Sequence, residues 1–110
     1  MNSGLAAETA VAAWLAARGY RLLERNWRTK SCELDIVAER RGVVYFVEVK
    51  YRRSSAFGDG FSYITAAKRR QLRYAARLWT ELKRWKGEQR LLAAAVSGRQ
   101  YESIEVVELE

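Results

Sequence analysis

Two acidic residues and one lysine near the middle of the chain have side-chain types and a spacing that a catalytic site could use. Glu48 and Lys50 are two residues apart in a strand-like run, so their side chains should leave the same face of a sheet. Asp35 lies thirteen residues before Glu48, in the preceding strand-like run. Carboxylate oxygens suit Mg²⁺ and Mn²⁺, and a neighbouring lysine can meet a phosphate or a water molecule. The pattern therefore predicts a divalent-cation site that acts on a phosphate group.

The turn between the two runs decides whether the carboxylates meet. If Arg41-Gly42 forms a two-residue hairpin turn, Arg40 pairs with Val43, and Asp35 lies directly opposite Glu48. The Cβ atoms of opposed residues are only ~4.5 to 5.5 Å apart, and like charges at that distance destabilise a sheet. A divalent cation would relieve the repulsion. A slip of one residue would instead turn Asp35 to the other face.

A second interpretation of the same residues needs no cation. Glu48 and Lys50 can form an ordinary ion pair beside a solvated Asp35. Exposed pairs of this kind contribute only ~0 to 1 kcal/mol and imply no function. The spacing alone leaves both interpretations open.

A helix is expected over residues 4–18, with Gly19 placed to end it. Its inward stripe is predicted to contain Leu5, Glu8, Val11, Ala12 and Leu15. Glu8 is unusual because a hydrophobic residue is expected at its position. It either lies at the edge of the stripe, where the helix macrodipole favours a carboxylate, or points inward for a functional reason.

Strands are expected over residues 20–25, 34–39 and 43–50, with a polar connection over 26–31. The run 43–47 is apolar on both faces and belongs in the middle of a sheet. A loop over 51–60 should lead to a long helix over 65–86, ended by Gly87. Its expected apolar side contains Ile64, Leu72, Ala75, Ala76, Trp79 and Leu82.

Strands over 91–96 and 103–109 are expected to close the fold around a Ser97-Gly98 turn. The order α-β-β-β-α-β, with a further strand, predicts an α/β fold with a central mixed sheet flanked by helices. A chain of 110 residues suits one domain, 1–110.

The amino-acid composition excludes several classes of catalytic and metal site. The chain has no histidine, which excludes histidine-ligated zinc and histidine-activated nucleophiles. The single cysteine, Cys32, cannot form an internal disulfide, which fits a reducing cytoplasm. No apolar run is long enough to span a membrane, so a soluble cytoplasmic protein without a membrane partner is expected.

Positive charge is concentrated on the second helix. Residues 66–86 hold eight basic residues and one acidic residue, an excess equal to the net charge of +7 for the whole chain. This pattern favours a nucleic-acid partner, with Lys68, Arg69 and Arg73 as phosphate contacts beside the Arg52-Arg53 pair. For the segment 83–86, a solvated helix face is an equally good explanation. Trp79 fits the apolar stripe and is expected in the core.

The combined pattern resembles the PD-(D/E)XK nuclease core of restriction-type endonucleases and archaeal Holliday junction resolvases. It is more closely similar to the uncharacterised bacterial UPF0102 (YraN-like) proteins, over most of the chain up to about Leu78. The matching residues are Ala7-Glu8, Gly19-Tyr20, Asn26, Glu33-Leu34-Asp35, Phe46-Val47-Glu48-Val49-Lys50, Arg52, Phe57-Gly58 and Lys68. The chain departs at Cys32, where the family usually has glycine, and at Leu92, where an aspartate is common.

The resemblance implies a restriction-endonuclease-like core and a catalytic cluster of Glu8, Asp35, Glu48 and Lys50. Asp35 and Glu48 would bind Mg²⁺ or Mn²⁺ directly, and Glu8 would reach the metal through water. Lys50 would activate or orient water and stabilise charge on the phosphate. Gln71 or Lys68 would contact the strand being cut.

The leading hypothesis is therefore a metal-dependent endonuclease acting on nucleic acid. DNA is favoured over RNA, and branched or damaged forms are included. The alternative is a non-catalytic nucleic-acid-binding module with a vestigial cluster, and a third reading is a protein-interaction domain. A homodimer would let two such sites cut the two strands of a nucleic acid. The sequence leaves the oligomeric state open.

Overall fold

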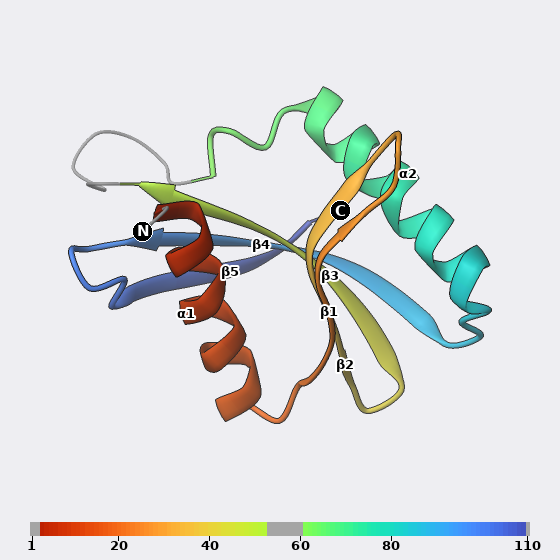
Figure 1. Ribbon diagram of the computed structural model, residues 1–110, viewed down its shortest axis with the longest axis horizontal. Helices are drawn as coiled ribbons and strands as arrows, with labels where there is room; N and C mark the ends of the chain where they lie inside the picture. Colours follow the sequence, from red (N-terminus) through yellow and green to blue (C-terminus); the bar gives the residue numbers. More distant parts are fainter. Residues whose placement is uncertain (1–2, 53–60, 110) are drawn as a thin grey trace.

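The computed structural model describes residues 3–52 and 61–109. In this part of the chain two helices and five strands follow the order α-β-β-β-α-β-β (Figure 1). Their bounds are α1 (Ser3–Ala17), β1 (Arg21–Arg28), β2 (Glu33–Arg40), β3 (Val43–Arg52), α2 (Ala66–Lys83), β4 (Glu88–Ser97) and β5 (Ser103–Leu109). The predicted α/β architecture and element order are confirmed.

The five strands form one sheet in the order β1-β2-β3-β4-β5. Strand β3 pairs with β4 in parallel, whereas the other neighbouring strands of the described sheet are antiparallel. A parallel pairing needs a long crossover, which α2 provides. The apolar run 43–47 lies in the third of the five strands, as its two-sided hydrophobicity predicted.

The β2–β3 turn has the predicted register. Arg40 pairs with Val43, and the pairing continues as far as Ile36 and Val47. Arg41 and Gly42 have φ angles of 54° and 81°, the left-handed values that a two-residue type I′ turn requires. The turn thus fixes which residues of β2 and β3 lie side by side.

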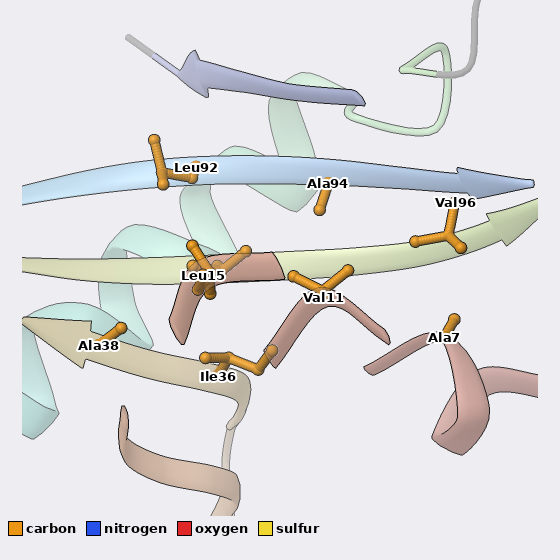
Figure 2. Packing of buried hydrophobic residues seen from close by; sticks show 9 residues of the cluster. Ala7, Val11, Leu15, Ile36, Ala38, Leu92, Ala94 and Val96 are labelled. Atoms are coloured by element: carbon orange, nitrogen blue, oxygen red, sulfur yellow. The ribbon is translucent and has the colours of Figure 1, made fainter. Parts of the chain in front are cut away.

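Helix α1 covers one face of the sheet. Ala7, Val11 and Leu15 are fully buried and pack against a cluster that includes Ile36 and other β2, β3 and β4 residues (Figure 2). Leu5 was predicted in this stripe, and that prediction was wrong, because its side chain is 49% exposed. The buried line runs through residues four apart, beginning at Ala7, and Leu5 lies off it.

Helix α2 covers the opposite face. Trp79 is buried as expected, and its ring meets Phe46 edge-on with the ring centroids 5.5 Å apart. Leu82 was predicted on this side but is 60% exposed, because the buried part of the helix ends at Trp79 and Thr80. The helix also ends before Gly87, at Lys83, where the following Arg84 adopts a left-handed conformation with φ 55°.

Four of the five strands are longer than predicted. β2 extends by one residue at each end, and β4 runs from Glu88 to Ser97 instead of over 91–96. β1 continues to Arg28 through the stretch expected to be a polar connection, and β3 continues to Arg52 instead of ending at Lys50. Backbone hydrogen bonding holds polar residues in a strand as readily as apolar ones, so hydropathy alone misses such extensions. Neither helix in the described part of the chain has the length and apolar character needed to cross a membrane.

Candidate active site

Asp35 and Glu48 lie side by side where strands β2 and β3 separate. The β2–β3 ladder ends at the pair of Ile36 and Val47. Asp35 and Glu48 occupy the next position in the same register, on the side away from the turn. Beyond that point the Asp35 side chain replaces the ladder, since its Oδ2 atom accepts a hydrogen bond of 2.9 Å from the Val49 amide. The hairpin register therefore brings the two carboxyl groups together, as expected.

The two carboxyl groups are shielded from water and interact with each other. The Glu48 side chain is only 12% exposed, and Asp35 is half-buried. Burial, reinforced by the negative charge of Asp35, raises the pKa of Glu48 to about 7. Burial also raises the pKa of Asp35, although the hydrogen bond from Val49 acts in the opposite direction. At neutral pH the two carboxyl groups thus favour binding a proton or another cation.

Lys68, rather than Lys50, neutralises this pair. The Lys68 Nζ atom on the first turn of α2 lies 3.0 Å from the Glu48 Oε2 atom. Lys50 leaves the same face of β3 as Glu48, but its side chain is exposed and, within the described residues, forms no ion pair. The simple Glu48–Lys50 ion pair beside a solvated Asp35 is therefore not the arrangement in the structure.

Glu8 approaches the pair from α1. Burial raises its pKa, the charge of Asp35 adds to this effect, and Arg25 and an Asn26 hydrogen bond oppose it. Its Oε1 atom is buried and has no hydrogen-bond partner among the described residues. Asn26 reaches Glu8 from a strand position with φ 52°, a conformation that asparagine tolerates well. Glu8 is thus half-buried near Asp35, with one oxygen unsatisfied.

Tyr63 was not expected in the site. Burial raises the pKa of its hydroxyl, and the charges of Glu48 and Asp35 raise it further, which places the ring beside the carboxylates. The Arg52 guanidinium lies 5.8 Å from the centre of the Tyr63 ring. Within residues 3–52 and 61–109, the Tyr63 hydroxyl and the Arg52 Nε atom are buried without hydrogen-bond partners. Arg52 was expected from its position, but nothing in the local sequence around Tyr63 indicated a role.

A divalent cation fits the donor set in part. The described residues contain no group of three or more acidic or cysteine side chains close enough to enclose a metal. Mg²⁺ usually takes only one or two protein carboxylates and keeps several water molecules. Asp35 and Glu48 meet that requirement, and the unsatisfied Glu8 oxygen suits a contact through water. A site of two direct ligands therefore fits better than one of three.

The predicted nucleic-acid contacts are distributed along α2. Arg69, Gln71 and Arg73 are exposed on this helix, one, three and five residues after Lys68. Arg53 lies outside the described residues. Farther along, Lys83 pairs with Glu24 of β1 at 3.2 Å, so part of the basic segment 83–86 is engaged within the fold.

The model of the uncharacterised protein family UPF0102 matches residues 7–108. A UPF0102 protein of Symbiobacterium thermophilum is 46% identical over 83 residues, which cover 71% of this chain and 70% of the relative. UPF0102 proteins of Rhodopseudomonas palustris and Nitrobacter winogradskyi are 44% and 45% identical over 78 residues. These alignments cover 71% of this chain and 58% and 64% of the two relatives. The chain belongs to the UPF0102 family.

Proposed function

We propose that this protein is a nuclease that hydrolyses phosphodiester bonds in nucleic acid, with DNA favoured, and requires Mg²⁺ or Mn²⁺. The observation that carries the proposal is the contact between the shielded Asp35 and Glu48 carboxyl groups. Two acids held together in this way destabilise a fold unless a cation joins them. Lys50 on the same face supplies the positive group that phosphate chemistry needs.

The side chains have distinct roles in this proposal. Asp35 and Glu48 would hold the cation, with Glu8 reaching it through water. A bound divalent cation polarises a phosphoryl oxygen and lowers the pKa of a coordinated water. Lys50 would orient the attacking water and neutralise the phosphate. Water adds its oxygen to phosphorus, one P–O ester bond breaks, and a proton passes to the departing oxygen.

Tyr63 and Arg52 offer further contacts to the substrate. The Tyr63 hydroxyl and the Arg52 Nε atom can donate hydrogen bonds that the described residues leave unused. Buried donors without partners are costly, and a phosphate oxygen is a strong acceptor. We therefore assign them to the phosphate next to the cleaved bond.

The ion pair between Lys68 and Glu48 favours a second candidate function. The Lys68 ammonium group, 3.0 Å from the Glu48 carboxylate, already supplies a positive charge without a metal. A nucleic-acid-binding module without catalysis would be stable in this state. In the nuclease, the cation would displace Lys68 from Glu48 and leave its ammonium group available to a phosphate.

Cleavage separates the two candidates. Linear duplex, single-stranded, flap and four-way-junction DNA, together with structured RNA, would each be incubated with the protein in Mg²⁺, Mn²⁺ or EDTA. The nuclease cuts at least one substrate in either metal and none in EDTA. Binding without cleavage of any substrate would favour the non-catalytic module.

The exposed arginines of α2 should set the salt dependence of binding. Replacing Arg69 and Arg73 with glutamine removes two phosphate contacts, so the slope of log affinity against log salt should fall by roughly 1.4 to 1.8. Fluorescence anisotropy with a labelled oligonucleotide in EDTA measures this slope at several salt concentrations.

A charge-matched control uses Arg41 and Arg99, which are exposed in the β2–β3 turn and after β4. Replacing both with glutamine lowers the net charge equally but should leave the slope near the parent value. Equal slopes for the two double variants would mean that α2 attracts nucleic acid only through net charge.

A further inference from the structure

The β1–β2 connection lies beside α2 (Figure 1). A groove is present between this connection and the first half of the helix. Its volume is about 750 Å³, within the range of sites that bind small organic molecules. Thr29 and Ser31 line one wall, and Lys68, Arg70, Gln71 and Tyr74 line the other. The groove is thus large enough for a nucleotide and is bounded by polar and basic side chains.

The groove reaches the candidate active site through one shared residue. Lys68 lines the groove, and its Nζ atom is 3.0 Å from the Glu48 Oε2 atom. A chain of phosphates lying along Arg70 and Lys68 would therefore arrive at the carboxylate pair. The charge of the groove matches such a polyanion.

Tyr74 gives the groove an aromatic surface. Its side chain is 53% exposed, which is unusual for a large aromatic residue, and its hydroxyl lies 3.3 Å from Ser31 Oγ across the groove. This contact holds the ring at the groove wall. An exposed aromatic ring among basic side chains is the typical platform on which an unpaired base stacks.

Resting on the proposed nuclease function, we infer that this groove binds a single-stranded segment of the substrate beside the cleaved bond, with one base stacked on Tyr74. Bases in a duplex are stacked inside the helix and cannot enter a concave pocket without being extruded. An unpaired strand presents both its bases and its phosphates. The preferred substrates are therefore single strands and junctions between single-stranded and duplex regions.

Binding in EDTA tests the groove without requiring cleavage. Anisotropy would compare labelled oligo-dT, oligo-U and a hairpin duplex of the same total length. The single strands should bind the parent more tightly than the duplex does. Replacing Tyr74 with alanine should weaken single-strand binding about tenfold or more and leave duplex binding unchanged. Tyr74→Phe keeps the ring and should retain most of the affinity.

Leu82→Ala is the matched control, because Leu82 is also a large exposed side chain on α2 but does not line the groove. It should bind every probe like the parent. An oligonucleotide with 5-iodouracil should cross-link to Tyr74 on irradiation. Equal single-strand binding by the parent and Tyr74→Ala, together with cross-linking elsewhere, would overturn the groove assignment.

The same variants separate this inference from the nuclease proposal. Tyr74-dependent single-strand binding by a protein that cuts no substrate would support the groove and reject the nuclease. Metal-dependent cleavage by a protein whose single-strand binding Tyr74→Ala leaves unchanged would support the nuclease and overturn the groove.

Discussion

The Glu48→Gln variant will cut nucleic acid about a thousandfold more slowly than the parent in Mg²⁺, because it loses a direct ligand of the proposed cation. The amide has nearly the same size and lacks the charge that binds the metal. Its fold should survive, because the substitution also removes the repulsion between Glu48 and Asp35. Initial rates on the best substrate, measured with equal protein concentrations, give the comparison.

Glu24→Gln provides the matched control for this experiment. Glu24 is also a largely shielded acid paired with a lysine of α2, at 3.2 Å from Lys83, but it lies outside the carboxylate pair. It should retain parental cleavage. If Glu48→Gln cut as well as Glu24→Gln, the carboxylate pair would not be the catalytic centre.

Without metal, the Glu48→Gln variant should become more stable than the parent as pH rises. A carboxyl group of ordinary pKa 4.5 has its pKa raised to about 7 in the folded protein by burial and by Asp35. The folded state therefore holds this proton more tightly than the unfolded state does. The resulting stabilisation is fully present below about pH 4.5 and is lost as the pH rises through about 7. Glutamine cannot lose a proton and avoids this loss.

Urea unfolding in EDTA would measure this difference. Between about pH 5 and pH 8, the free energy of unfolding of the parent should fall by about 2 to 3 kcal/mol relative to the variant. Excess Mg²⁺ at the higher pH should restore stability to the parent and less to Glu48→Gln. Parallel curves for the two proteins in EDTA would show that Glu48 titrates as an ordinary exposed acid.

The central hairpin could be predicted because residues close together in the sequence determine its turn and its register. Arg41-Gly42 specifies a turn type, the turn specifies the register, and the register places Asp35 near Glu48. The alternation of side chains then places Lys50 on the face of Glu48. Each step depends on neighbouring residues and on the geometry of a strand pair.

The surroundings of this hairpin could not be predicted in the same way. Lys68 and Tyr63 reach Glu48 from segments that follow it by fifteen residues or more, and their approach depends on how α2 packs on the sheet. Periodicity identified α2 and its buried side, but not where along the helix the contact with the sheet ends, which is why Leu82 was misassigned to the core. An error at one residue also occurred at an end of the first helix, where Leu5 was predicted to be buried but is exposed, whereas Ala7 is buried.

From the parallel pairing of β3 with β4 we also expect an order of assembly. Strands β1 to β3 form a meander of near neighbours, whereas β4 can join only after the chain has crossed over through α2. Loop-closure entropy delays such distant pairings. We therefore expect the two acids to meet before their counter-ion Lys68 arrives with α2. Until then their repulsion opposes the hairpin, so dissolved cations should accelerate folding as well as stabilise its product.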